Sequence, residues 1–92
     1  MAEFRIFETA QFQTDLQQEV HGQQARLQRK LAAYGYPQLR QNPYVGTNIK
    51  KWRDAAAETW RYRLGDDRFF YTVDERQRLV FMLTADHRGR AS

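Results

Sequence analysis

The chain has no cysteine, and only two prolines and five glycines among its 92 residues. Without cysteine it can form neither a disulfide framework nor a thiolate metal site, and this absence is typical of a protein from a reducing cytoplasm. No apolar run approaches the roughly 18 to 20 residues of a membrane span, and no signal peptide opens the chain. These absences favour a soluble cytoplasmic protein with no membrane partner. The length predicts a single domain over residues 1–92.

Acidic residues are fewer than basic ones, which leaves a formal charge of +4, and arginine greatly outnumbers lysine. The planar guanidinium binds phosphate through paired hydrogen bonds, which an ammonium group cannot do. Most of the positive excess lies in the second half of the chain. The composition therefore favours a polyanionic partner such as nucleic acid.

In the first half of the chain, the pattern of apolar residues predicts one strand and two helices. Residues 3–7 alternate in the manner of a strand buried mainly on one side, and Thr9 is placed to cap the next element. Residues 10–21 carry apolar side chains every four positions, at Phe12, Leu16 and Val20, which predicts an amphipathic helix. After Gly22, a second helix is predicted to end near Gly35. Its apolar residues are Ala25, Leu27, Leu31, Ala32 and Tyr34.

Residues 36–48 contain two prolines and a glycine, so we expect a loop with at most a single helical turn over 38–41. Residues 49–52 predict a short basic strand, and residues 53–57 a turn. Residues 79–85, LVFMLTA, form an apolar run of strand length that suits a strand covered on both faces. Residues 86–92 are expected to be a polar tail.

The stretch from Trp60 to Val73 predicts a β-hairpin with Gly65 and Asp66 as its two-residue loop. In that register Leu64 pairs with Asp67, Arg63 with Arg68, Arg61 with Phe70 and Trp60 with Tyr71. Side chains alternate along a strand, so one surface is shared by Trp60, Tyr62, Phe69, Tyr71 and Val73. Arg61, Arg63 and Arg68 gather on the other.

The predicted fold class is α+β, in the order β-α-α-β-β-β-β. Short connections between the last strands favour antiparallel pairing of neighbours. The helical hairpin must bury its apolar stripe against the aromatic face of this mainly antiparallel sheet, which leaves the arginine face open.

This basic face has two interpretations. It can be a solvated surface whose cations pair partly with Glu58, Asp66, Asp67 and Asp86. It can equally be an anion site for a nucleic-acid backbone, because like charges opposite one another in a sheet are unfavourable without a counter-charge. Cleavage of RNA needs an activated 2′-hydroxyl, charge stabilisation at the phosphate and a proton for the leaving oxygen, and arginines supply the second need.

Proton transfer requires a group other than arginine, which stays protonated. The titratable candidates are Lys50, Lys51, Glu58, Tyr71 and His87, of which Tyr71 is expected in the core, and we assign no role to His21. No metal-ligand spacing, glycine-rich phosphate loop or nucleophile elbow is found. We therefore expect neither a metal nor another cofactor.

Three segments resemble the RelE/ParE superfamily of bacterial and archaeal type II toxins. They are NPYVGTNIKKW in the middle of the chain, WRYRLGDDRFFYTVDE after it, and the closing VFMLTADHR. Most specific is the run WRYRLGDDRFFY, with its arginine-rich strand, Gly-Asp turn, and arginine followed by apolar residues and a tyrosine. With the helical hairpin, the resemblance covers almost the whole length and implies the fold of that family.

The resemblance also implies an activity and partners. RelE-like members cleave messenger RNA in the ribosomal decoding site, and each is paired with a cognate antitoxin protein. Carried over by motif, Arg61, Arg63, Arg68 and Arg88 would form the catalytic set, with His87 as a proton-transfer group. Lys50, Lys51 and Arg53 would contact message or ribosomal RNA.

Two other functions remain open. ParE-like members of the same fold inhibit DNA gyrase without acting as nucleases. A binding module that has lost toxicity is the third reading, since the chain reads GRAS after its His-Arg, where many RelE-like chains carry a tyrosine. The converging cations of the sheet favour the ribosome-dependent endoribonuclease.

Overall fold

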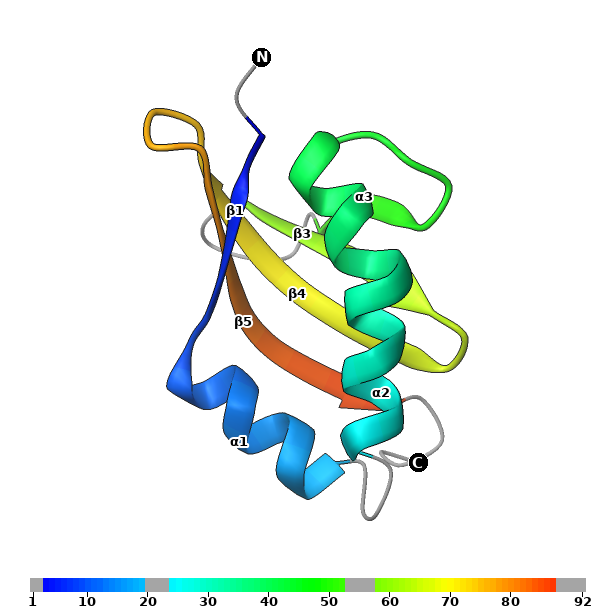
Figure 1. Cartoon of the computed structure of the whole chain (residues 1–92). Coiled ribbons are helices and arrows are strands. Elements are labelled where there is room, and N and C mark those ends of the chain that lie inside the picture. Colours follow the sequence, from blue (N-terminus) through cyan, green and yellow to red (C-terminus); the bar gives the residue numbers. More distant parts are fainter. Residues whose placement is uncertain (1–2, 20–23, 53–57, 88–92) are drawn as a thin grey trace.

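The computed structural model describes residues 3–19, 24–52 and 58–87. Within them a five-stranded sheet has the strand order β1-β5-β4-β3-β2 (Figure 1). Strand β1 is parallel to β5, and the other neighbours are antiparallel. The strands are β1 (Arg5–Glu8), β2 (Ile49–Trp52), β3 (Thr59–Leu64), β4 (Asp67–Asp74) and β5 (Leu79–His87). The predicted order of elements and the mainly antiparallel sheet are confirmed.

The hairpin of β3 and β4 has the predicted register, with Arg63 paired to Arg68 and Arg61 to Phe70. Gly65 has a φ of 60°, while Asp66 is not among the residues with positive φ. A positive φ at the first loop position alone is typical of a type II′ turn, whose twist matches that of the flanking strands. A glycine at position 65 therefore fixes which side chains share a face.

The pairing of β4 with β5 contains a bulge. Tyr71 pairs with Met82 but Phe70 pairs with Thr84, so Leu83 has no partner in the register. An extra residue reverses the alternation beyond it. As a result Asp86, rather than Ala85, lies opposite Arg68.

The second predicted helix is longer than expected, and its predicted end near Gly35 is wrong. Helix α2 (Gln24–Lys30) continues through a π-helical turn, η1 (Leu31–Gly35), into α3 (Tyr36–Gln41). The Tyr36 N–H bonds to the Leu31 carbonyl, the i→i+5 pattern of a π-turn. Pro37 lies in the first turn of α3, where proline's missing N–H is tolerated. A proline that the sequence suggested as a helix breaker thus begins a new helical segment.

Helix α1 (Ala10–Glu19) is capped by Thr9, as predicted. The Phe12 N–H donates to Thr9 Oγ1 over 3.2 Å, while the Thr9 hydroxyl donates to the Met82 carbonyl at 2.8 Å. Farther along α1, the Asp15 carboxylate accepts hydrogen bonds from the Thr84 hydroxyl and from the Ala85 N–H. Since β1 pairs with β5 only as far as Met82, α1 satisfies polar groups of β5 beyond the end of β1.

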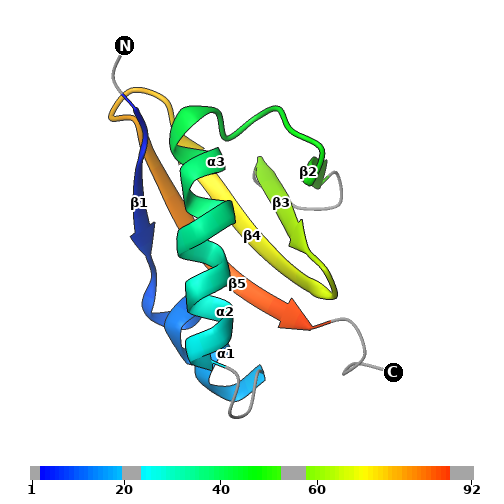
Figure 2. The same cartoon turned by 45° about the vertical axis from the view of Figure 1, so that its right-hand side comes forward.

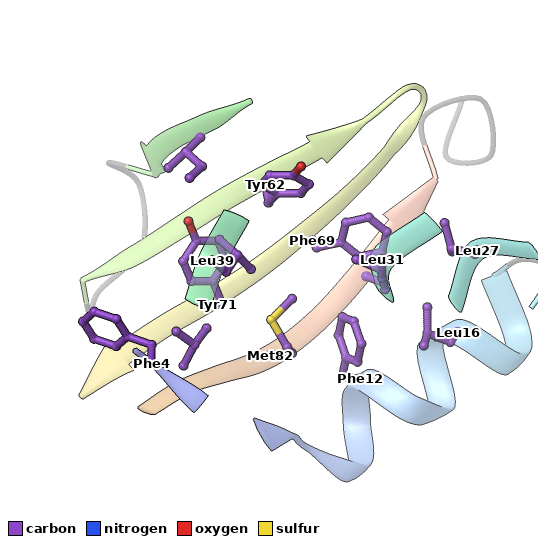
Figure 3. Packing of buried hydrophobic residues seen from close by; sticks show 13 residues of the cluster. Phe4, Phe12, Leu16, Leu27, Leu31, Leu39, Tyr62, Phe69, Tyr71 and Met82 are labelled. Carbon is purple, nitrogen blue, oxygen red and sulfur yellow. The ribbon is translucent and has the colours of Figure 1, made fainter. Parts of the chain in front are cut away.

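The helices cover one face of the sheet, and the core lies between them and that face (Figures 2 and 3). The predicted packing of Leu16, Leu27 and Leu31 in one cluster with Tyr62, Phe69 and Tyr71 is confirmed, with Trp60 partly buried against it. Tyr34, expected on the apolar stripe, is 66% exposed. The π-turn changes the helical period at this point, so the spacing that holds for Leu27 and Leu31 fails for Tyr34.

Strand β5 extends to His87, beyond the predicted end at residue 85. Its Val80 and Met82 are fully buried, whereas Leu79 and Phe81 are half-buried. The expectation that both faces are covered is wrong, because the helices lie on one face only. No helix in the described ranges is long and apolar enough to cross a membrane.

Candidate nucleic-acid interface

The open face of the sheet, opposite the helices, brings together basic side chains from β2 and β3. Lys50 is paired with Arg61, and Arg61 in turn with Phe70, so the three residues form a row across β2, β3 and β4. A second row begins at Arg63 and passes through Arg68 to Asp86. The face predicted from the hairpin register therefore gathers Lys50 with the three arginines.

Lys50 and Arg61 form no ion pair with a carboxylate of the described residues. Arg61 Nε is buried and has no hydrogen-bond partner there. Two hollows, of about 170 and 250 Å³, open beside these side chains, and Lys50 and Arg61 line both. The first is completed by Lys51 and Trp52, and the second by Thr47, Asn48 and Arg63. This arrangement can hold an anion.

The other two arginines have partners. Arg63 Nε donates to the Gly65 carbonyl at 3.1 Å. Arg68 Nη2 forms an ion pair with Asp86, and about a third of each side chain is exposed. This pair agrees with the solvated-surface reading for Arg68. Because its Nε lacks a partner among the described atoms, Arg68 keeps a donor that this ion pair does not use.

Lys51 differs from its neighbour Lys50. Its ammonium forms a 2.9 Å ion pair with Glu58 and lies 5.9 Å from the centre of the Trp60 ring. In the register Lys51 pairs with Trp60, whose side chain packs against the core. Lys51 is thus directed to the Trp60 side of the strand, away from Arg61.

An aromatic pair next to the cations was missed by the sequence analysis. The rings of Trp52 and Phe70 have their centres 4.8 Å apart and are inclined by 43°. Trp52 remains 42% exposed. The alternation of side chains in β2 and β4 was the signal that could have found them, since it places both on the face of Arg61.

The remaining candidates lie elsewhere or outside the described residues. Tyr71 is in the core, as expected, and its hydroxyl donates to the Pro43 carbonyl at 2.6 Å. Burial raises the pKa of Tyr71 well above its ordinary value. The Cα of His87 pairs with that of Asp67, one position beyond Arg68 and Asp86. Arg53, Arg88 and His21 lie outside the described residues. No group of metal-ligating side chains occurs in the described part of the chain.

The arrangement of helices and strands is similar to that of solved RelE structures. The RelBE2 toxin–antitoxin complex of Mycobacterium tuberculosis matches with a TM-score of 0.72 at 24% identity, over 94% of this chain and 99% of that one. The archaeal RelE–RelB complex of Pyrococcus horikoshii OT3 matches with a TM-score of 0.68 at 23% identity, over 97% and 99%. This chain has the RelE fold.

Free E. coli toxin RelE, in a variant with two arginines replaced by alanine, has the same fold, with a TM-score of 0.62 at 19% identity over 100% of this chain and 88% of that one. The sequence matches no protein-family model and no curated protein. The resemblance inferred from sequence motifs is therefore confirmed at the level of the RelE fold.

Proposed function

We propose that this protein is the toxin of a type II toxin–antitoxin pair and inhibits translation by cleaving messenger RNA on the ribosome. The observation that carries the proposal is the pair Lys50 and Arg61, opposite one another on the open face without a described carboxylate partner. Directly opposed like charges destabilise a sheet. A phosphodiester backbone between them removes that repulsion, and the RelE fold supports a toxin rather than another basic protein.

The proposed chemistry divides the site by role. Arg61 and Arg63 lie two residues apart on β3 and would hold the scissile phosphate, whose charge increases in the transition state. Lys50 would exchange a proton with the attacking or leaving oxygen. His87 and Arg88, at the end of β5 and beyond, would complete the catalytic set. Arg68 would contribute its positive field while it remains paired with Asp86.

The proposed partners follow from the same surface. Lys51 and Arg53 would contact the message and ribosomal RNA. A cognate antitoxin would bind the toxin, as RelB does in the two complexes of similar fold. Its docking segment should combine acidic residues with apolar anchors. Copurification with the product of a neighbouring reading frame would test this partner.

The function is tested by primer extension on translated message, with purified ribosomes and folded protein. We expect cleavage by the wild type, and a loss of about 100-fold to 1,000-fold for Arg61→Ala, which removes a preorganised donor. The matched control is Arg29→Ala, since Arg29 is exposed on α2 in the helical layer. This control removes the same charge away from the site and should cleave like the wild type.

Two results would contradict the proposal. Equal cleavage by wild type and Arg61→Ala would remove Arg61 from the site. Absence of cleavage by a folded wild type on translating ribosomes would reject the nuclease and favour gyrase inhibition, which a supercoiling assay measures.

A further inference from the structure

The side chains of Trp52 and Phe70 contact one another although their strands are not neighbours, because β3 lies between β2 and β4. The indole must therefore lie across β3. Thr59, which pairs with Trp52 in the register, is only 5% exposed. The indole thus has a fixed support beneath it, while 42% of the residue remains exposed to solvent.

The exposed side of this pair borders a charged hollow. The hollow of about 170 Å³ is lined by Trp52 together with Lys50, Lys51 and Arg61. Of these cations, Lys50 and Arg61 have no carboxylate partner among the described residues. An aromatic surface beside them matches the two parts of a nucleotide, whose base is planar and whose phosphate is anionic. An acidic peptide would satisfy the cations but would leave the indole without a planar partner.

We propose that Trp52, supported by Phe70, is a stacking platform for one unpaired base of single-stranded RNA, with the adjoining phosphate held by Lys50 and Arg61. This proposal rests on the proposed function, which it deepens by giving the site a direct contact to a base. Stacking on an aromatic side chain accepts any base, so the platform orients the nucleotide without selecting its sequence. Phosphate contacts alone would leave the strand free to slide along the face.

Intrinsic fluorescence tests the platform without ribosomes or cleavage. The chain has two tryptophans, and Trp60 Nε1 is buried without a described hydrogen-bond partner, so Trp60→Phe loses no such bond and leaves Trp52 as the reporter. The probes are a short 2′-O-methyl oligoribonucleotide, which resists cleavage, and an abasic strand of equal length. We expect the base-containing strand to quench Trp52 and to bind more tightly than the abasic strand.

Substitutions then separate the contribution of base stacking to the affinity from that of phosphate binding. In Trp52→Leu the affinity for the base-containing strand should fall about 5-fold to 150-fold, toward that of the abasic strand. Trp52→Phe should retain part of the preference. Lys50→Ala should weaken the binding of both strands by the same factor and reduce the salt dependence of that binding. Circular dichroism and urea unfolding confirm that each variant is folded.

Three results would overturn the platform. They are equal affinity of the wild type for the two strands, an unchanged preference in Trp52→Leu, and quenching by an acidic peptide but not by RNA. The last would assign the surface to a protein. A base preference that depends on Trp52 in a protein that does not cleave message would support the platform while rejecting the nuclease, so the two failures are distinguishable.

Discussion

At the scale of single residues, the titratable side chains of Tyr36 and Tyr71 are held in structural roles. The hydroxyl of Tyr36 donates to Glu8, and burial raises its pKa well above the ordinary value. Tyr71 is fully buried, and its hydroxyl binds the carbonyl of Pro43, which is also fully buried. Both phenols remain protonated at neutral pH, and neither belongs to the open face.

Replacing Tyr71 by phenylalanine should therefore reduce stability without affecting the proposed RNA cleavage. The Pro43 carbonyl would lose its partner, and an unsatisfied buried acceptor costs about 1 to 3 kcal/mol. Urea unfolding measures the loss, with Tyr34→Phe as the control because Tyr34 is 66% exposed. Normal stability combined with a large loss of cleavage would contradict this assignment and place Tyr71 in the chemistry.

The pH dependence of stability has a definite sign for Tyr71. The folded-state pKa of Tyr71 is raised above the ordinary value of 10.0. The contribution of its hydroxyl to the unfolding free energy is therefore fully present below about pH 10. Above that pH the unfolded chain releases the proton first, and stability is lost as the pH rises. In Tyr71→Phe the alkaline loss of unfolding free energy should be shallower, which would be followed by urea unfolding between neutral and alkaline pH.

At the scale of elements, the hairpin was predictable and the end of the helix was not. Gly65 and Asp66 form a local signal, and the register follows from the loop length alone. Pro37 gave an ambiguous signal, because proline ends a helix from within but is tolerated in its first turn. The π-turn, in which Leu31 and Gly35 are buried, decides whether the helix ends before Pro37 or continues through it.

Gly35 itself is selected by packing rather than by helix propensity. A Cβ there would lie 3.1 Å from Leu31 Cδ2 and 3.3 Å from Tyr62 Cε2. Alanine is favoured over glycine in a helix by about 1 kcal/mol, but forcing an extra methyl group into a packed core costs about 1 to 3 kcal/mol. We therefore expect Gly35→Ala to lower the unfolding free energy.

The matched control for Gly35 is Ala33→Gly, because Ala33 is exposed in the same π-turn. At this exposed position helix propensity should outweigh packing, so replacing alanine by glycine should lower the unfolding free energy by about 1 kcal/mol. Urea unfolding of both variants tests the contrast. A stabilised Gly35→Ala protein would mean that the core around Tyr62 has room for the added methyl group.

At the scale of the whole molecule, the sheet carries the core on one face and the proposed site on the other, which separates the two. The arginine face could be predicted because alternation in one hairpin places its side chains. The partner of Arg68 could not be assigned, because Asp86 lies opposite it only through the bulge at Leu83. Alternation in β2 places Trp52 on the same face, but its contact with Phe70 spans three strands, and no local pattern encodes that contact.

This separation predicts that removing a charge from the open face stabilises the fold. Lys50 opposes Arg61 directly, whereas Lys51, one residue away, is paired with Glu58 at 2.9 Å. Opposed like charges in a sheet are destabilising by about 0.2 to 1 kcal/mol, and exposed ion pairs stabilise by a similar amount or less. At low salt, Lys50→Gln should therefore increase the unfolding free energy, and Lys51→Gln should leave it unchanged or decrease it. The gain in Lys50→Gln should fade as salt screens the repulsion.

In RNA cleavage, the same two variants should rank in the opposite order. If Lys50 takes part in binding and cleaving RNA, Lys50→Gln becomes more stable and less active, the relation expected of a residue retained for function at the expense of stability. Lys51→Gln should keep most of its cleavage activity. Urea unfolding at low and high salt, together with primer extension on translated message, provides both measurements. A Lys50→Gln protein that is less stable than the wild type at low salt would show that Lys50 has a stabilising partner, and the repulsion between Lys50 and Arg61 could no longer support an anion site.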